Sequence, residues 1–289
     1  MYVHSSSAFI CDPVDTIDGM KEDLKKYTDY YFRRINKFIM LSLMGVHQCI
    51  HASPVSPSAA VYLATENGNL GDTENVLEQI YRKNSFPKPF NFINTMSNTA
   101  SFYVAQSLKT LGRSITLSSK NVSFERALEL AKTDFELNHI TEALVGGVDE
   151  AVASLDERCA KNHESCHNIR MVEGSCWLRL KPEKDGAAGE IIDVRTFAEM
   201  KAAARWIEGA AGSPVTLAFG IFTTPADRIE WRHALPGAEE FDYLSGYGYY
   251  DTAAALAISA FFLRFSGRSL VHANMTADGQ HIVTVCKSY

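Results

Sequence analysis

The sequence predicts an α/β protein. Short runs rich in β-branched and other apolar residues alternate with longer segments in which apolar residues recur every three or four positions. The chain has 289 residues, of which 46% are hydrophobic and 21% charged. This composition is typical of a globular protein with a buried core, and it excludes disordered and fibrous chains. The alternation along the whole chain favours sheets covered by helices.

The first part of the chain contains five predicted strands and four predicted helices. The strands are short apolar runs bounded by polar or turn-forming residues, at 7–11, 59–64, 114–118, 143–148 and 175–180. The helices have an apolar stripe with helical spacing, at 35–49, 73–81, 99–111 and 124–137. Each of the first three helices lies between two predicted strands, as α/β folds require.

The second part repeats this coarse order. A polar stretch with two glycines, residues 181–189, separates the parts as either a linker or a long turn. Strands are predicted beyond it at 190–194, 215–219, 269–275 and 281–286, with a helix at 252–264. No residue-level repeat is visible, but the order predicts a pseudo-duplicated fold. We expect one domain, 1–289, with an N-terminal half, 1–182, and a C-terminal half, 188–289.

Charge and apolar run lengths exclude several classes of function. Lys and Arg number 28 against 34 Asp and Glu, a net charge of −6, so the chain has no general attraction for nucleic acid or an anionic membrane. The longest apolar stretches, 38–46 and 253–263, fall short of the ~20 residues of a membrane span. Six irregularly spaced cysteines predict reduced thiols. The first residues lack a secretion signal, so we expect a cytoplasmic protein. We expect no cofactor.

One turn has the form of a nucleophile site. Residues 112–131 predict a strand, a polar turn and then a helix with the stripe Phe124, Ala127, Leu128 and Ala131. Such an elbow suits a nucleophile, because the helix begins with free N–H groups and a positive dipole end. Here the elbow carries Asn121. Its side chain either caps the helix or contacts a ligand or partner.

The elbow resembles that of the β-ketoacyl synthases of the thiolase-like fold, which reads approximately G-P-S-I-x-x-x-T-A-C-x-S. Gly112, Ser114, Ile115 and Ser123 match this pattern. Four further segments resemble family motifs in the correct order along the chain: 33–38, 89–98, 142–150 and 173–174. The resemblance implies a compact version of the thiolase-like fold, with pseudo-duplicated layers in the order α-β-α-β-α.

The same resemblance implies that the catalytic side chains are missing. It places Asn121 on the nucleophilic cysteine, Phe219 and Gly246 on the two histidines, and Phe241 on the lysine. Ser245 stands where the second histidine motif has a glycine. Of the closing glycine loop, only Asn274 and Gly279 match, and the negative charge of Asp278 in that loop would oppose an oxyanion. Decarboxylative condensation needs a thiolate, imidazoles and oxyanion donors. Ser118, Ser119 and Ser123 are poor substitutes because a serine nucleophile needs a neighbouring base. We therefore expect no catalysis by this chain alone.

The family provides a role for such a chain. Type II polyketide systems pair a catalytic ketosynthase with a cysteine-less homologue, the chain-length factor, which shapes the shared acyl tunnel. The short length resembles the compact factors of aryl polyene systems, whereas Asn121 stands where better-known factors have glutamine. The expected partners are a ketosynthase, in a heterodimer, and an acyl carrier protein through that complex. The expected process is polyketide or fatty-acid-like chain elongation.

By analogy with the family, two stretches reach the dimer interface and set chain length. They contain Asn69, Leu70 and Thr73 at the start of a helix, and Asn91, Phe92, Thr95 and Met96 in an extended segment. Phe92 is the first candidate for the end of the tunnel, with burial in the core as the alternative. The tyrosines at 247, 249 and 250 fit a pocket or, slightly better, an interface. Arg33, Arg34 and Lys37 fit either a carrier-protein contact or a solvated helix face.

Two other functions remain open. Cys159, His163, Cys166 and His167 carry the ligand types that zinc prefers, but adjacent Cys166 and His167 would not both reach one tetrahedral ion. We therefore predict no metal site, and a metal-dependent regulatory module is only an alternative. A second alternative is a decarboxylase that makes starter units from malonyl carrier protein. Product formation by the isolated chain would distinguish that enzyme from a chain-length factor.

Overall fold

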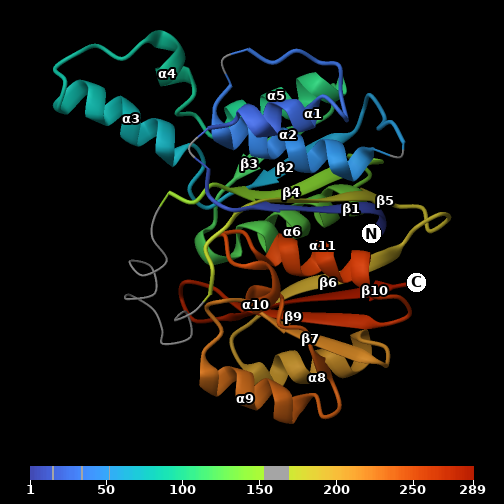
Figure 1. Cartoon of the computed structure of the whole chain (residues 1–289). Helices are drawn as coiled ribbons and strands as arrows, with labels where there is room; N and C mark the ends of the chain where they lie inside the picture. Colours follow the sequence, from blue (N-terminus) through green and yellow to red (C-terminus); the bar gives the residue numbers. More distant parts are fainter. Residues whose placement is uncertain (15, 34, 52, 153–168) are drawn as a thin grey trace.

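The computed structural model describes residues 1–14, 16–33, 35–51, 53–152 and 169–289. Its helices and strands form the layers α-β-α-β-α (Figure 1). The strands of the first half are β1 (Tyr2–Cys11), β2 (Ala60–Ala64), β3 (Ser114–Leu117), β4 (Ala143–Asp149) and β5 (Glu173–Lys181). Those of the second half are β6 (Gly189–Phe197), β7 (Val215–Phe219), β8 (Glu239–Glu240), β9 (Ser269–Met275) and β10 (His281–Ser288).

The two halves have the same strand order. From its outer edge inward, the first half is ordered β3-β2-β4-β5-β1. From its own outer edge inward, the second half is ordered β8-β7-β9-β10-β6, so each strand has a counterpart at the same place in the other half. In each half, the second strand of the chain order lies parallel to both its neighbours. The fifth strand is antiparallel to both of its neighbours, the fourth and the first. The halves meet where β1 pairs with β6, through Tyr2 with Glu190 and Val3 with Gly189. The predicted pseudo-duplication is confirmed.

Helices cover both outer faces and fill the space between the two sets of strands (Figure 1). On one outer face lie α1 (Asp18–Leu24), α2 (Lys37–Ile50) and α5 (Asn98–Leu108), with α2 against β1, β4 and β5. On the other lie α8 (Met200–Ala210) and α9 (Pro225–Ala234), with α8 against β6 and β10. The central layer is α6 (Ser123–Glu136) with α11 (Ala254–Arg264).

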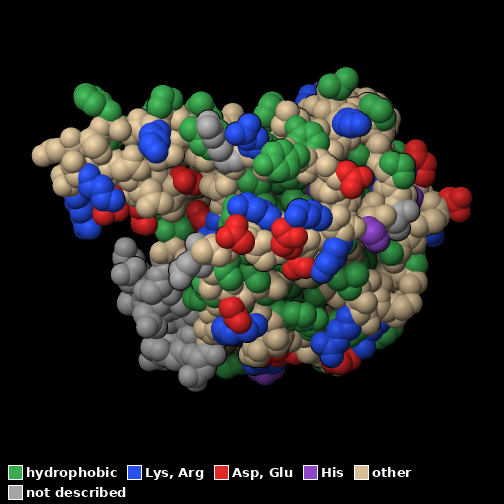
Figure 2. All heavy atoms as spheres, turned by 45° about the horizontal axis from the view of Figure 1, so that its top comes forward, with side chains coloured by type: hydrophobic (Ala, Val, Ile, Leu, Met, Phe, Trp, Pro, Cys, Tyr) green, Lys and Arg blue, Asp and Glu red, His purple; other side chains and the backbone are tan. Residues whose placement is uncertain are grey.

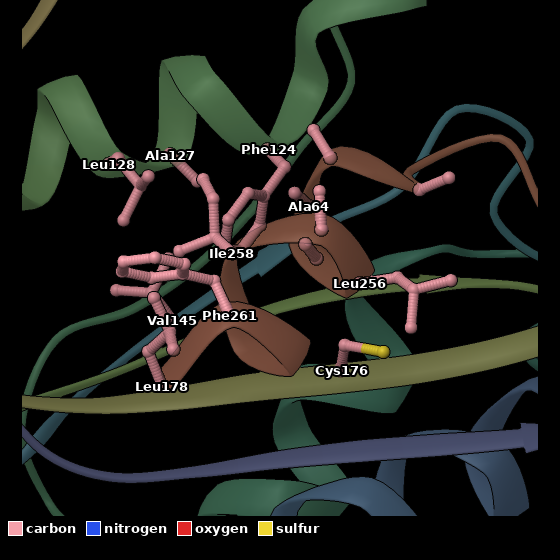
Figure 3. Close-up of a cluster of buried hydrophobic side chains, with 14 of the residues drawn as sticks. Ala64, Phe124, Ala127, Leu128, Val145, Cys176, Leu178, Leu256, Ile258 and Phe261 are labelled. Atoms are coloured by element: carbon pink, nitrogen blue, oxygen red, sulfur yellow. The ribbon is translucent and has the colours of Figure 1, made fainter. Parts of the chain in front are cut away.

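The central layer is the core of the molecule. Phe124, Ala127 and Leu128 of α6 point toward Ile258 and Phe261 of α11, above the strands β4 and β5 (Figure 3). All the predicted stripe residues of α6 are buried. Alanines on α11 permit a close approach to β4, since a Cβ on Gly147 would lie only 2.6 Å from the Cβ of Ala255. The core therefore fixes α6, and with it the elbow that precedes α6.

An arm projects from the first half. It consists of α3 (Leu70–Tyr81), the following loop and α4 (Pro89–Ile93), and it extends away from the layers (Figure 1). The expectation of an extended segment at Asn91 and Phe92 is wrong, because both lie in α4. Pro89 occupies the first turn of α4, where its fixed φ favours a helix and its missing N–H costs nothing. None of the described helices combines the length and apolarity of a bilayer span.

Candidate functional site

The elbow has the predicted form of strand, turn and helix. After β3 the chain enters the 3-10 turn η1 (Lys120–Val122), and α6 begins at Ser123. The Ser119 amide donates to Ser123 Oγ at 2.9 Å, and that hydroxyl donates to the Lys120 carbonyl oxygen at 2.9 Å. Asn121 is half-buried within η1. Its predicted capping role is wrong: Val122 is the N-cap residue of α6, and no side chain caps that end.

Asn121 lines a small cavity. The volume is about 10 Å³, and the lining includes Glu125 of α6, Tyr249, Thr252 and Asn274 of β9. A space of this size holds at most one water molecule, for which ~10–15 Å³ is needed. Glu125 Oε2 is buried without a hydrogen-bond partner among the described residues. The space beside the elbow therefore has no room for an acyl chain in this structure.

A buried polar network lies along this cavity. Asn274 Nδ2 donates to the Asn121 carbonyl oxygen at 3.0 Å and to Glu125 Oε1 at 2.8 Å. Glu125 Oε1 lies 3.8 Å from His272 Nδ1, and the Tyr243 hydroxyl of α10 (Tyr243–Tyr247) lies 3.3 Å from His272 Nε2. All four side chains are buried. The network thus joins α6, β9, α10 and the elbow.

Burial determines the protonation of this network. It raises the pKa of Glu125 to about 7, against an opposing hydrogen bond from Asn274. It lowers the pKa of His272 to about 4, so this imidazole is neutral at pH 7. Burial also raises the pKa of Tyr243, with the Glu125 charge as the second cause. A neutral imidazole, a carboxyl near its titration point and an amide cannot supply a thiolate nucleophile.

Two serines of the elbow, Ser118 and Ser123, direct their hydroxyls away from any base. Ser118 Oγ donates to the Glu66 carbonyl oxygen at 3.0 Å, and Ser123 Oγ donates to the Lys120 carbonyl oxygen at 2.9 Å. Both hydroxyl hydrogens are therefore directed at backbone carbonyls. A serine needs a hydrogen-bonded base to become a nucleophile. The arrangement does not provide one.

Three residues assigned to family catalytic positions do not line the Asn121 cavity. Phe219 packs among Met200 and Trp231, on the side of β7 that faces α8 and α9. The Phe241 ring lies 5.4 Å from that of Phe265, and Gly246 is exposed in α10. Gly220, Ile221 and Phe222, which follow Phe219, form part of the lining instead. The assignment of these positions to catalytic residues of the family stays a prediction.

Glu125, His272 and Tyr243 are the site residues that sequence reasoning missed. The sequence contains a pattern that could have pointed to His272. His272 and Asn274 interrupt an apolar strand two positions apart, and this spacing places both side chains on one face of β9. The partner Glu125 belongs to the first turn of α6 and precedes Asn274 by 149 positions. Periodicity finds such residues but not their partners.

The base of the arm is tied to the body by buried polar groups. Asp149 Oδ1, at the end of β4, accepts from Thr65 Oγ1 at 2.6 Å and from the Glu66 amide at 2.9 Å. Asn69 is buried and its Nδ2 donates to the Met96 carbonyl oxygen at 2.8 Å. Thr73 Oγ1 donates to the Asn69 carbonyl oxygen at 3.0 Å. Asn69 and Thr73 therefore hold the start of α3 and connect it to the end of the arm.

The predicted chain-length residues beyond this base lie on the surface of the arm. Phe92 is 60% exposed and Met96 is 47% exposed, so the alternative of a core role for Phe92 is wrong. Leu70, Asn91 and Thr95 are half-buried. Figure 2 shows hydrophobic side chains along the outer edge of this part of the molecule. The exposed apolar side chains of the arm, together with Met96 shortly after α4, are here called the arm surface: Leu77, Ile80, Tyr81, Phe86, Phe92, Ile93 and Met96.

Other sequence candidates have mixed outcomes. The preference for an interface role is wrong for Tyr249 and Tyr250, which are buried within the chain, with the Tyr250 hydroxyl donating to the Gly147 carbonyl oxygen at 3.3 Å. Lys37 forms an ion pair with buried Glu173, whereas Arg33 is exposed. Arg34 and the cysteines and histidines of 159–167 lie outside the described residues. Within the described part of the chain, no group of three or more His, Cys, Asp or Glu is placed to hold a metal ion.

Comparisons with known proteins identify the fold. No protein-family profile and no curated protein matches the sequence. Among solved structures, the ishigamide ketosynthase/chain length factor is similar, with 16% identity, 99% of both chains covered and a TM-score of 0.73. A type II PKS acyl-carrier protein in complex with its ketosynthase, AntDE:AntF, gives 14% identity, coverage of 100% and 99%, and a TM-score of 0.71. The 3-oxoacyl-[acyl-carrier-protein] synthase III from Aquifex aeolicus VF5 gives 13% identity, 99% coverage of both chains and a TM-score of 0.60. The predicted thiolase-like fold is confirmed.

Proposed function

We propose that this chain is a non-catalytic chain-length factor. It pairs with a catalytic β-ketoacyl-[acyl carrier protein] synthase and shapes the tunnel that holds the growing acyl chain. The observation that carries the proposal is Asn121, at the elbow of a ketosynthase-like fold, beside a cavity of only about 10 Å³. An amide has no ionisable proton and forms no thioester, and no acyl chain fits beside it.

The arm surface supports a heterodimer with a ketosynthase. Its seven exposed apolar side chains lie on the projecting arm or directly after it, and exposed apolar side chains gathered on one part of a molecule favour an interaction site. The family resemblance gives the occupant, because Phe92 and Met96 lie in the stretch expected at the dimer interface. Within this proposal, Phe92 projects from α4 into the partner and limits the length of the product.

The wider setting follows from the same role. The complex receives its substrates from an acyl carrier protein and serves polyketide synthesis, of the aryl polyene type, or a related fatty-acid-like elongation. Residues 1–289 act as one domain, with β1 and β6 joining the halves 1–182 and 188–289. We also propose a cytoplasmic location. The four described cysteines, Cys11, Cys49, Cys176 and Cys286, are all free thiols, as in a reducing compartment.

Co-expression with a ketosynthase tests the proposal. We expect a 1:1 complex by size-exclusion chromatography, which elongates malonyl units on a carrier protein, while this chain alone is inert. Tyr81→Lys combined with Phe92→Lys should abolish the complex by placing two charges on the arm surface. Ile229→Lys is the matched control: Ile229 is 52% exposed on α9, in the other half, and its variant should still bind. A stable monomer or homodimer that elongates unaided would contradict the proposal.

A further inference from the structure

A second cavity lies between α1 and the segment that leads into α2. Its volume is about 640 Å³, within the ~300–1,000 Å³ range of small-molecule sites. Leu24 of α1, Ile35 and Met40 line it and are buried. These side chains belong to the hydrophobic core below α2, so they form a fixed apolar floor. The cavity shares no lining residue with the small cavity beside Asn121.

Aromatic side chains form part of the wall. Tyr30 and Phe32 both line the cavity, and their ring centroids lie 4.7 Å apart. Tyr31 between them is 80% exposed, so most of its ring has no packing partner in the free chain. A ligand with an apolar body would bury ring surface that is otherwise in water, which favours binding.

The charged groups at the cavity favour an anionic end on that ligand. Three bases, Lys21, Lys25 and Arg33, line the cavity against two acids, Glu22 and Asp29. The lysines are already ion-paired along α1, Lys21 with Asp18 at 3.0 Å and Lys25 with Glu22 at 2.7 Å. Arg33 is exposed and forms no ion pair with another described residue. A guanidinium binds a carboxylate through two parallel hydrogen bonds.

We propose that this cavity binds a monocarboxylate with an apolar body, an acyl or aryl acid. The apolar body lies on Leu24, Ile35 and Met40 beside the aromatic wall, and the carboxylate binds Arg33. Figure 2 shows Lys and Arg side chains next to hydrophobic ones over this face of the molecule. The inference does not depend on the chain-length role, because it uses no residue of the elbow or the arm surface.

Calorimetric titration of the full chain with octanoate and with the neutral octanamide tests this site. Wild type should bind octanoate saturably and about tenfold more tightly than octanamide, the worth of a charged hydrogen-bonded pair. Arg33→Gln should remove that preference while leaving octanamide binding unchanged. Tyr31→Ala should weaken both ligands by about threefold through lost apolar contact. Both side chains are exposed, so neither variant should change the unfolding transition.

Arg205→Gln is the matched control. Arg205 is an exposed arginine on α8, in the other half, and its variant should bind both ligands as wild type does. Three results would overturn the proposal: no saturable binding of octanoate, equal affinity for both ligands in wild type, or a loss in Arg205→Gln equal to that in Arg33→Gln. If an acyl carrier protein binds in place of octanoate and Arg33→Gln abolishes that binding, the cavity is part of a protein interface and the proposal is wrong. The chain-length role would be untouched by any of these results, because its test is the complex.

Discussion

The side-chain amide of Asn274 donates to the backbone carbonyl oxygen of Asn121 at 3.0 Å, and so joins β9 of the second half to the elbow of the first. The same amide donates to the buried carboxyl of Glu125 at 2.8 Å. Gly220 is required beside it, since a Cβ at this position would lie 2.1 Å from Asn274 Oδ1. The elbow is therefore held to β9 by a structural contact through its backbone.

Asn121→Cys should not create a condensing enzyme. The variant supplies a thiol at the elbow, but His272 is the only imidazole among the described members of the local network, and burial lowers its pKa to about 4. The cavity beside residue 121 is also too small for an acyl chain. We expect no elongation of malonyl carrier protein above the wild-type background, and no acylated protein by mass spectrometry. Turnover by the purified variant alone would show that only the thiol was missing.

Asn274→Ala should destabilise the protein by about 1–3 kcal/mol. The variant removes donors to the Asn121 carbonyl oxygen and to Glu125, and it leaves both acceptors buried without that partner. Urea unfolding measures the free energy of unfolding. Asn75→Ala is the control, because Asn75 is exposed on α3 and makes no described contact with the elbow. Equal stability of the two variants would contradict a structural role for Asn274.

The Glu125→Gln variant should be more resistant than wild type to rising pH. Burial raises the pKa of Glu125 to about 7 from an ordinary value of 4.5, so the folded state keeps a proton that the unfolded chain releases. The stability contributed by this group is present below pH 4.5 and lost as the pH rises through 7. Relative to Gln, wild type should lose up to about 3 kcal/mol between pH 4 and pH 8.

The comparison must be made as a difference between the two proteins. His272 acts in the opposite direction, because its lowered pKa gives stability that is present above pH 6.5 and lost as the pH falls toward 4. Subtracting the wild-type curve of unfolding free energy from that of Glu125→Gln leaves the Glu125 contribution. Glu230→Gln, at an exposed position on α9, should give a flat difference. A flat difference for Glu125→Gln as well would show that its carboxyl is ionised in the folded protein.

Phe92→Ala should lengthen the products of the complex with a ketosynthase. Removing the ring lengthens the proposed tunnel, because the ring blocks its end. The free energy of unfolding should change by no more than about 0.5 kcal/mol, because the side chain is 60% exposed. Mass spectrometry of the released products measures their length. Phe86→Ala is the control, since Phe86 lies in the loop between α3 and α4 and is 99% exposed. Unchanged products from an intact Phe92→Ala complex would exclude Phe92 as the length determinant.

The sequence alone determined the fold to a useful extent. Apolar runs such as 143–148 and 215–219 predicted β4 and β7 almost to the residue, because strands buried on both faces are continuously apolar. The stripe Phe124, Ala127, Leu128 and Ala131 predicted α6, and the polar turn before it predicted the elbow. A short element was not predicted: Asn91 and Phe92, expected in an extended segment, lie in the helix α4. Five residues are too few for a helical period to appear in the sequence.

Tertiary structure decided what the site became. Glu125 and Tyr243 are far in the chain from each other and from the pair His272 and Asn274, and only the packing of α6, α10 and β9 brings them into one network. The altered pKa values of Glu125, Tyr243 and His272 come from burial, which depends on neighbours from both halves rather than on local sequence. Likewise, Phe92 and Tyr249 are both aromatic residues, yet Phe92 is exposed on the arm and Tyr249 is buried and lines the cavity beside Asn121. Local patterns determine which elements form, whereas side-chain burial depends on contacts between residues distant in sequence.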